Sequence, residues 1–482
     1  MKLETITIEE FDGQMLHPSL DIKNGVLTLG FCYRTKPREE KDIFVIVNDG
    51  NMQIVTSDSF TVKEQSYFFE KRARKLSRLE EKWAVSALQQ LINDNKVLKP
   101  NIAAKIIFEK FVSLAKRYIE LEKEIDYYLL VAWIIGTYFF PLFYTYPFLH
   151  IKAPKRSGKS QLLNFLLQLC FNAIKARPSL AALGDTVDSL RGTYLIDQAD
   201  VLRRKGSEDL SDILADSYKQ NGGKRRIIDF NKKRGREILE LETYSPKAFA
   251  SIKELPEDLR DRCLMVPLIR SQKNFPDPDD SNENWRELRG ELYQLLMASY
   301  DFVDSTYVTK KIGYRKNQEI LGRDLELWLP FEVILECSGM DEKIVEAKKR
   351  FLSQYGFSEY EPSELEEEVV KTILNQFKDG VNVILTPKEI SELINVEEVF
   401  YTGDSLKQKA AKVGWAIKKL NLPSEKKPRS KEGVRYLFEK NKVENIYRSY
   451  FKNGAEPTPP TPTGSDGLNA KQMTVQDFDV GF

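Results

Sequence analysis

Apolar and polar positions divide the chain into segments of different periodicity. Short runs of apolar or alternating character occupy Val26–Tyr33, Asp42–Val47 and Met52–Ser57. Asn48–Asn51, between the last two runs, has the composition of a tight hairpin turn. This pattern predicts a small β-rich domain over residues 1–75.

Helical spacing of apolar residues follows and predicts a helical linker over residues 76–125. The next segment, Tyr127–His150, has no charged residue in 24 positions, which is long enough to cross a bilayer. It is rich in aromatic residues, and two prolines interrupt its second half. We interpret it as a buried helix over Ile125–Phe140 and a core strand over Phe148–Lys152, so no membrane contact is expected.

The remaining chain separates into four parts. Residues 126–270 alternate apolar runs with helical stretches, which indicates an α/β core. Residues 271–360 have the pattern of a helical lid, and residues 361–450 that of a helix-rich unit with a basic hairpin. Residues 451–482 begin with a Pro/Thr/Gly-rich stretch and are expected to be disordered.

Composition narrows the function classes. The 482 residues are 41% hydrophobic and 30% charged, which is typical of folded soluble domains. Four scattered cysteines and two histidines make a zinc site, a disulfide scaffold or histidine-based catalysis unexpected. The N-terminus has no signal-peptide pattern, so a cytoplasmic location is expected. The net charge of +1 predicts no polyanionic partner for the chain taken as a whole.

A phosphate-binding loop is predicted at Ala153–Ser160, APKRSGKS. It fits G-x-x-x-x-G-K-[ST] except that alanine takes the first position, and an apolar strand precedes it and an amphipathic helix follows. Backbone N–H groups at a helix N-terminus bind phosphate, lysine reaches the β- and γ-phosphates, and the hydroxyl ligates Mg²⁺. The alternative is a solvated turn. Candidate residues for binding ATP with Mg²⁺ are Ala153, Ser157, Gly158, Lys159, Ser160 and Gln161.

An acidic site follows at a suitable distance along the chain. A short apolar run, Thr193–Ile196, ends in Asp197, which is the candidate second Mg²⁺ ligand. The next residue, Gln198, can orient a water molecule but cannot accept its proton, which puts hydrolysis in doubt. Asp200 is a candidate substitute carboxylate. A core strand ending in a capping aspartate is the alternative.

The order of these motifs resembles the AAA+ ATPases of mobile-element replication proteins, which are related to the superfamily III and MCM helicases. The similar stretch runs from Asp126 to Val434 and includes SGKS, LIDQAD, NGGKRR and GRDLELWLP. Its most specific part is SPKAFASIKELPEDLRDR. The resemblance implies an AAA+ core with a C-terminal winged helix, although this family usually has glutamate at the position of Gln198.

The resemblance also implies roles for single residues. Ser251 corresponds to sensor 1, Arg262 (with Arg260 second) to an arginine finger, and Arg323 to sensor 2. A finger reaches the nucleotide of a neighbouring subunit, so a homo-oligomeric ring, a hexamer, is implied. The alternatives are an arginine in a surface ion pair and a salt-bridged lid residue.

Two basic segments are candidates for DNA contact. Lys224–Ser245 is predicted to form two strands around a basic tip, and a hairpin at this place projects into the pore of the related rings. Lysine and arginine without base-reading partners indicate phosphate contacts; a solvated turn is the alternative. The candidate tip residues are Lys232, Lys233, Arg234 and Arg236.

The second basic segment lies in the predicted winged helix. Ser405–Lys440 contains 11 basic and 3 acidic residues, a net charge of +8. Ser405–Leu422 is the predicted recognition helix and Glu425–Phe438 the wing; a protein contact is the alternative. The predicted core face of the helix is Val413, Trp415, Ala416 and Leu420. The candidate DNA-binding residues are Lys407, Lys409, Lys412, Lys418, Lys419, Lys426, Lys427, Arg429 and Arg435.

The C-terminal tail, Asn453–Phe482, has a net charge of −3. Gln472, Val475 and Phe478 have the spacing of a sliding-clamp-binding peptide, but Asp479 replaces the second aromatic residue. A solubilising tail is the alternative.

Taken with the resemblance, these patterns predict an ATP-dependent DNA helicase or replication initiator of a plasmid or virus, acting as a ring on single-stranded or forked DNA or at an origin. Two alternatives remain: an ATP-binding, weakly hydrolysing DNA-binding protein, and an AAA+ remodeller of a protein partner. The charge of +1 is then a sum of unlike parts, with DNA contacts at two local sites.

Overall fold

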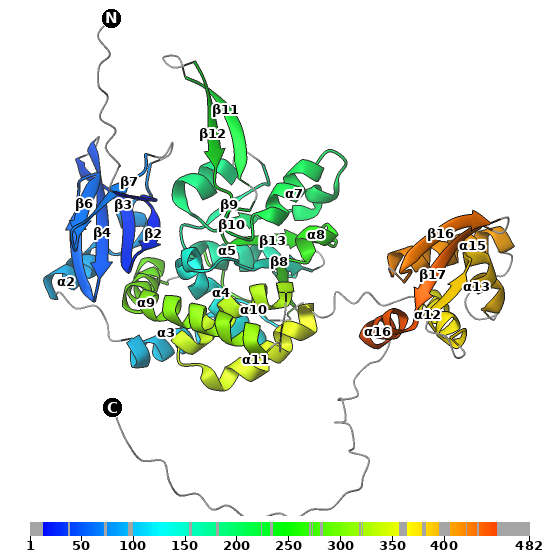
Figure 1. Ribbon diagram of the computed structural model, residues 1–482. Helices are drawn as coiled ribbons and strands as arrows, with labels where there is room; N and C mark the ends of the chain where they lie inside the picture. Colours follow the sequence, from blue (N-terminus) through cyan, green and yellow to red (C-terminus); the bar gives the residue numbers. More distant parts are fainter. Residues whose placement is uncertain are drawn as a thin grey trace, which may run out of the picture. The chain divides into compact units, whose positions relative to one another are not determined.

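The computed structural model describes residues 13–450, except 37–38, 72–74, 95–99, 154–156, 180–182, 223, 232–234, 269–270, 272, 280–282, 318–319, 321, 356–363, 378–381, 395–404, 421 and 431–432. The chain divides into two compact units, residues 1–358 and 359–482 (Figure 1). Each unit has its own hydrophobic core. The predicted tail peptide at Gln472–Phe478 lies outside the described residues.

Seven strands lie near the start of the first unit. A four-stranded antiparallel sheet has the order β2 (Leu20–Lys23), β3 (Val26–Lys36), β4 (Glu39–Asn48), β5 (Asn51–Val55). A second sheet has the order β1 (Gln14–Leu16), β7 (Gln65–Phe69), β6 (Ser59–Val62). The hairpin predicted at Asn48–Asn51 is confirmed: Asn48 pairs with Asn51, and Asp49 and Gly50 both have positive φ.

Helices join these strands to the rest of the unit. They are α1 (Leu79–Lys82), α2 (Val85–Asp94), α3 (Pro100–Tyr118), α9 (Trp285–Asn317), α10 (Gly322–Cys337) and α11 (Asp341–Tyr355). Phe31 of β3 meets Tyr293 of α9 edge to face at 5.5 Å, and Trp83 stacks on Tyr293 at 4.9 Å. One face of the four-stranded sheet therefore shares a core with the predicted linker, ATPase core and lid, and its other face packs with β1 and β7 in a smaller core of its own.

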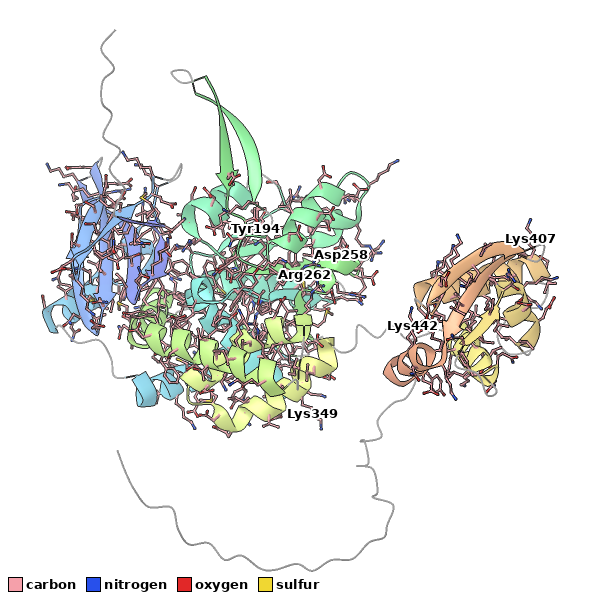
Figure 2. All side chains as sticks on the ribbon, in the orientation of Figure 1. Tyr194, Asp258, Arg262, Lys349, Lys407 and Lys442 are labelled. Carbon is pink, nitrogen blue, oxygen red and sulfur yellow. The ribbon has the colours of Figure 1, made fainter. Side chains whose placement is uncertain are left out.

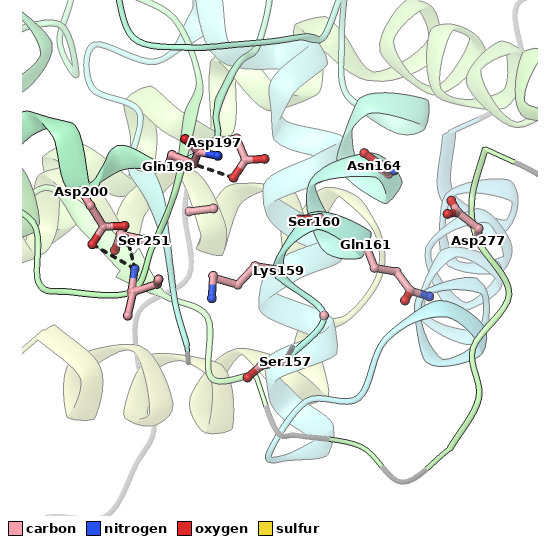
Figure 3. A pocket seen from close by; sticks show the side chains of 13 residues that line it. Ser157, Lys159, Ser160, Gln161, Asn164, Asp197, Gln198, Asp200, Ser251 and Asp277 are labelled. Carbon is pink, nitrogen blue, oxygen red and sulfur yellow. Dashed lines mark hydrogen bonds between the residues drawn. The ribbon is translucent and has the colours of Figure 1, made fainter. Parts of the chain in front are cut away.

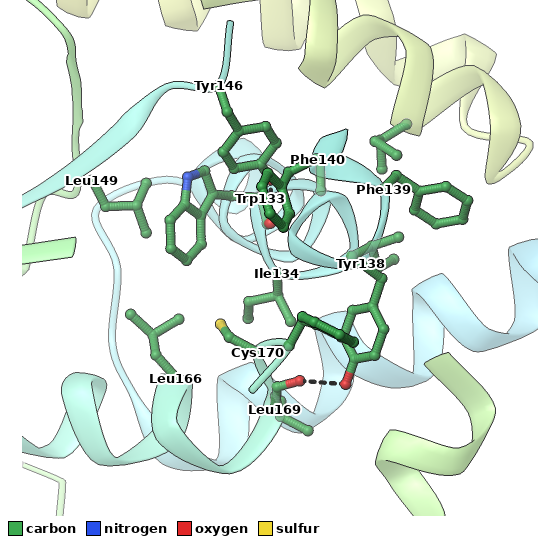
Figure 4. Close-up of a cluster of buried hydrophobic side chains, with 14 of the residues drawn as sticks. Trp133, Ile134, Tyr138, Phe139, Phe140, Tyr146, Leu149, Leu166, Leu169 and Cys170 are labelled. Atoms are coloured by element: carbon green, nitrogen blue, oxygen red, sulfur yellow. Dashed lines mark hydrogen bonds between the residues drawn. The ribbon is translucent and has the colours of Figure 1, made fainter. Parts of the chain in front are cut away.

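The aromatic helix α4 (Glu124–Phe139) lies at the centre of this core (Figure 4). The segment Glu124–Leu142 is long and apolar enough to span a membrane, but 83% of that window is buried inside the protein. Trp133 donates to the Pro147 carbonyl at 2.8 Å, and the Tyr146 hydroxyl donates to the Trp133 carbonyl at 2.6 Å. The predicted buried helix is confirmed, as is the predicted strand, β8 (Phe148–Lys152).

A five-stranded parallel sheet forms the middle of the unit. Its strand order is β14 (Cys263–Met265), β8, β13 (Lys247–Ser251), β10 (Tyr194–Ile196), β9 (Ile174–Ala176). The elements between and around these strands are α5 (Lys159–Leu169), η1 (Phe140–Leu142), η2 (Gly184–Asp188), η3 (Ala199–Arg203), α7 (Glu208–Asp216) and α8 (Glu257–Arg260). The α/β class predicted for this region is confirmed.

The second unit has a three-stranded antiparallel sheet and four described helices. The strands have the order β15 (Asn382–Leu385), β17 (Gly433–Glu439), β16 (Glu425–Ser430). The helices are α12 (Glu364–Asn375), α13 (Pro387–Leu393), α15 (Leu406–Lys419) and α16 (Lys440–Tyr450). Thr386 caps α13, because its Oγ1 accepts from the Glu389 N–H at 3.1 Å and Pro387 takes the first helical position.

One prediction for this unit is wrong. Val413, Ala416 and Leu420 are buried in the core between α12, α13 and α15 as expected, but 61% of Trp415 is exposed. The helix turns about 100° per residue, so Trp415 lies about 100° from Ala416 and about 200° from Val413. Indole hydrophobicity suggested burial, but helix geometry places this side chain outside the core.

We predict that Gly136→Ala destabilises the protein. A Cβ at Gly136 of α4 would lie 2.3 Å from the hydroxyl oxygen of Tyr146, which is fully buried. Overpacking of this kind costs about 1–3 kcal/mol of unfolding free energy. Denaturant unfolding measures the change. Gly313→Ala in α9 is the matched control, because its Cβ meets open space; equal stability of the two variants would contradict the packing.

Candidate functional site

The carboxyl edge of the parallel sheet places three chain segments side by side. Strand β13 lies between β8 and β10, and Ser251 at its end pairs in register with Lys152 of β8. The phosphate-loop segment follows β8, and Asp197 follows β10. Parallel strands end at a common edge, where open α/β sheets bind ligands.

A cavity of about 530 Å³ opens at this edge (Figure 3). Nine of the predicted site residues line it: Ser157, Gly158, Lys159, Ser160, Gln161, Asp197, Gln198, Asp200 and Ser251. Asn164 of α5 and Asp277 also line it; no motif in the sequence marks either residue.

The helix α5 begins directly at this cavity. Gly158 is its N-cap residue, with φ of 85°, a left-handed conformation that glycine adopts without strain. The first N–H groups of an α-helix have no intrahelical partner, so they are available to an anion. The Lys159 ammonium donates to the Ala153 carbonyl at 2.5 Å. Burial lowers the pKa of Lys159, and the nearby Asp200 and Asp197 oppose that shift.

Alanine at the first loop position is accommodated. Ala153 is buried, and its N–H donates to the Ser251 carbonyl at 3.3 Å. The methyl group therefore lies within the protein, and the backbone keeps its link to the neighbouring strand. Residues 154–156 of the loop lie outside the described part of the chain.

The acidic side of the cavity contains two carboxylates in different settings. Asp197 accepts from the Gln198 N–H at 2.9 Å, and Gln198 is exposed in a left-handed conformation with φ of 56°. Asp200 accepts from the N–H group of Ile252 at 3.0 Å (Figure 3) and from that of Lys253 at 2.8 Å. Burial alone would raise the pKa of Asp200, but these two backbone hydrogen bonds lower it.

Asp200 therefore stabilises the loop that follows Ser251. Both of its oxygens accept from that loop, which is a structural role that its predicted use as a substitute base did not include. Its lowered pKa makes it a weaker proton acceptor.

His150 lies behind Ser251 and was not predicted as a site residue. The Ser251 hydroxyl donates to the Lys253 carbonyl at 2.6 Å and lies 2.8 Å from His150 Nε2. A hydroxyl has one proton to donate, so we assign the Nε2–H tautomer, which donates to Ser251. Burial lowers the pKa of His150 to about 4, so the ring is neutral at pH 7. A histidine in an apolar strand has no sequence signal for this contact.

A second cavity, of about 180 Å³, shares Ser157, Gly158 and Gln161 with the first. Its other walls come from two segments, residues 118–120, which precede α5 in the sequence, and residues 268–275, which follow it. The Gln161 amide donates to the Tyr118 and Pro276 carbonyls, each at 2.9 Å, and so joins these walls. The remaining lining residues are Tyr118, Ile119, Glu120, Leu268, Ser271, Lys273, Asn274 and Phe275. Sequence reasoning missed them because no motif marks them.

The predicted arginines do not line either cavity. Arg262 is buried, its guanidinium lies 5.1 Å from the Tyr218 ring centroid, and it donates to the Asp258 carbonyl (Figure 2). Arg323 forms an ion pair with Asp261, and Arg260 is partly buried. Within one chain, these arginines contact protein groups rather than the nucleotide-site cavity.

The basic hairpin predicted between Asp197 and Ser251 is present. β11 (Arg225–Asn231) and β12 (Gly235–Leu241) pair antiparallel and extend away from the sheet (Figure 1). The tip residues Lys232, Lys233 and Arg234 lie outside the described residues, and Arg236 is placed only by its backbone in β12.

The base of this hairpin is tightly held. The Glu242 N–H donates to Asp188 at 2.9 Å, and Arg191 pairs with Asp21 at 3.1 Å and Glu242 at 3.6 Å. Lys247 is fully buried and donates to carbonyls in the connection between β12 and β13. The hairpin is thus linked to the N-terminal strands and to the strand that ends in Ser251.

The basic residues of the second unit lie on α15 and the β16–β17 hairpin. Lys407, Lys418, Lys426 and Arg435 are exposed, and Lys409, Lys412 and Lys427 are partly buried. Lys427 pairs with Glu425 at 2.6 Å. The side chains of Lys419 and Arg429 are not among those described.

Searches for similar proteins gave structural matches only. No family model and no curated protein matches the chain. It is similar to the SCCmec type IV Cch active helicase, with a TM-score of 0.36, 10% identity, and coverage of 86% of this chain and 93% of that one. It is also similar to the apo NrS-1 C-terminal region, with a TM-score of 0.33, 9% identity, and coverage of 86% of this chain and 96% of that one. A third match is a full-length MCM homolog from Methanopyrus kandleri, with a TM-score of 0.34, 9% identity, and coverage of 68% of this chain and 78% of that one.

We predict that His150 makes stability depend on pH. The folded state binds this proton only near pH 4, whereas the unfolded chain binds it below its ordinary pKa of 6.5. The unfolded state therefore holds more protons between these values, and stability falls as pH falls from 6.5 to 4, by about 3 kcal/mol for this group. Denaturant unfolding of wild type and His150→Gln across this range measures it. The unfolding free energy of His150→Gln should depend less steeply on pH than that of wild type. Equal pH dependence in the two proteins would contradict the lowered pKa of His150.

Proposed function

We propose that the chain is an ATP-dependent DNA helicase or replication initiator of a mobile genetic element. One observation carries this proposal: Gly158, Lys159 and Ser160 at the start of α5 share a cavity with Asp197, Gln198 and Ser251. These residues come from three adjacent parallel strands. A phosphate loop and an acidic strand end in one cavity support binding of a nucleoside triphosphate more strongly than either motif alone.

The two cavities suit the two ends of a nucleotide. The phosphates would lie at the N-terminus of α5, where the helix N–H groups and Lys159 supply positive charge. The base would enter the second cavity, because the shared residues Ser157, Gly158 and Gln161 connect the two spaces. Ser160 and Asp197 would hold Mg²⁺, which neutralises phosphate charge when bound.

The residues around the phosphates can orient water but lack an evident strong base. Gln198 is exposed at the cavity and can hydrogen-bond an attacking water. The Ser251 hydroxyl can turn from the Lys253 carbonyl to that water, while His150 keeps its oxygen in place. Gln198 cannot take a proton, and the Asp200 carboxylate is engaged by the N–H groups of Ile252 and Lys253. We therefore expect slow ATP turnover in the absence of DNA.

DNA contact is proposed at the β11–β12 hairpin and at the second unit. The hairpin is linked through Lys247 and β13 to the strand end at Ser251, so a change at the phosphates has a short covalent route to DNA. We further infer that the second unit is a winged helix, because its described elements run helix, strand, helix, helix, strand, strand, helix. A cytoplasmic hexameric ring remains part of this proposal. Arg260, which is partly exposed, is better placed to act across subunits than Arg262, which is buried.

Gln198 also favours a second candidate function. A DNA-binding protein that binds ATP and scarcely hydrolyses it would use nucleotide only to assemble. The two functions differ in DNA-stimulated turnover and in strand displacement on a forked duplex; a protein remodeller would show stimulated turnover without unwinding.

We predict that Lys159→Ala abolishes ATP turnover. Loss of the ammonium removes charge that binds the β- and γ-phosphates, and we expect a fall of about 100-fold or more in kcat/KM. Phosphate release with and without single-stranded DNA measures it. Lys349→Ala, at an exposed position of α11, is the matched control. Turnover that is absent, unstimulated by DNA and unchanged in Lys159→Ala would reject the helicase proposal.

We predict that Gln198→Glu raises basal turnover by about tenfold or more, because a carboxylate can accept the proton of the attacking water. The same phosphate-release assay measures kcat. Gln198→Ala is the control, because it removes the amide without supplying a carboxylate and should not raise turnover. Unchanged kcat in Gln198→Glu would show that this position does not limit hydrolysis.

A further inference from the structure

Helix α15 in the second unit combines positive charge with an exposed indole. The helix, LKQKAAKVGWAIKK, contains five lysines and no acidic residue. Trp415 is 61% exposed, more than any other large aromatic side chain in the described residues. Single exposed apolar residues are common on protein surfaces, so the significance of this one depends on its neighbours.

Helical spacing defines those neighbours. Residues three apart lie side by side on a helix surface, so Lys412 and Lys418 flank Trp415 on either side along the helix. Lys418 is exposed and Lys412 partly exposed. The opposite side of α15 is anchored by Val413, Ala416 and Ile417, which are fully buried. A rigid, packed helix therefore presents an indole between two ammonium groups.

We propose that Trp415, Lys412 and Lys418 form a binding site for single-stranded DNA. The indole would stack on an unpaired base, and the two ammonium groups would contact the phosphates on either side. Every base has an aromatic face, so such a site tolerates any sequence. In a duplex these faces are covered by the neighbouring base pairs, so the site selects unpaired DNA.

The chemistry around Trp415 fits DNA better than a protein partner. A protein interface needs a wider apolar centre than one large side chain. The other large apolar side chain that is exposed among the described residues of this helix, Leu406, lies nine residues away, about half a turn around the helix. The lysines, in contrast, complement a polyanion directly. The inference builds on the DNA contact proposed above and names its ligand, but it needs no nucleotide.

The experiment uses the full-length chain without nucleotide, so its outcome is independent of ATPase activity. Binding of a labelled oligothymidine and of a labelled duplex is followed by fluorescence anisotropy. Trp415→Ala should weaken single-strand binding by about tenfold and leave duplex binding unchanged, whereas Trp415→Phe should retain most of the affinity because phenylalanine also stacks.

Two controls separate this role from a structural one. Leu406→Ala removes another exposed apolar side chain, 43% exposed, from a different side of α15 and should leave both affinities unchanged. Lys412→Ala with Lys418→Ala should lower the salt dependence of binding, with a slope reduced by about one for each lost phosphate contact. Because Trp415 is outside the core, Trp415→Ala should still unfold in one cooperative thermal transition.

Fluorescence gives a direct readout of stacking. Trp83, Trp133 and Trp328 are fully buried and Trp285 is partly buried, so iodide should quench mainly Trp415. Oligothymidine should quench this emission and protect it from iodide, and Trp415→Phe should lose the effect. Three outcomes would each overturn the proposal. Trp415→Ala could bind single-stranded DNA as tightly as wild type, it could lose as much affinity for duplex as for single-stranded DNA, or oligothymidine could fail to protect the wild-type emission from iodide.

Discussion

The position of β13 between β8 and β10 is the constraint on which the candidate site depends. Backbone hydrogen bonds to both neighbouring strands fix the register of β13, and so fix where Ser251 lies relative to the ends of β8 and β10. Asp200 then holds the following loop through the N–H groups of Ile252 and Lys253. Groups separated by about 100 residues along the chain reach one cavity because parallel strands must share an edge.

The same strand connects the site to the rest of the first unit. At its start, buried Lys247 bonds the connection from the β11–β12 hairpin; at its end, Ser251 contacts His150 on β8. Both lysine and histidine are held in surroundings that lower their pKa, and burial is the cause in each case. Strand β13 is thus fixed by polar contacts at both ends and by apolar packing between them.

Local signals predicted the parts of the site that form from contiguous residues. The loop around Gly158, Lys159 and Ser160 and the strand before Asp197 follow from short-range patterns, since helix starts and strand ends are local events. The cavity lined by Tyr118 and Lys273 had no such signal, because its walls come from distant segments. The contact between His150 and Ser251 was missed for the same reason.

The sequence by itself determined the order of strands, helices and motifs, because hydrophobic periodicity, caps and turn residues act over a few positions. It also determined the local excess of positive charge on α15 and the hairpin that follows it. Only the tertiary structure decided which side chains share a cavity, that Arg262 is buried against Tyr218, and that Trp415 faces solvent. Those outcomes depend on which elements pack together, and packing joins residues that no local pattern relates.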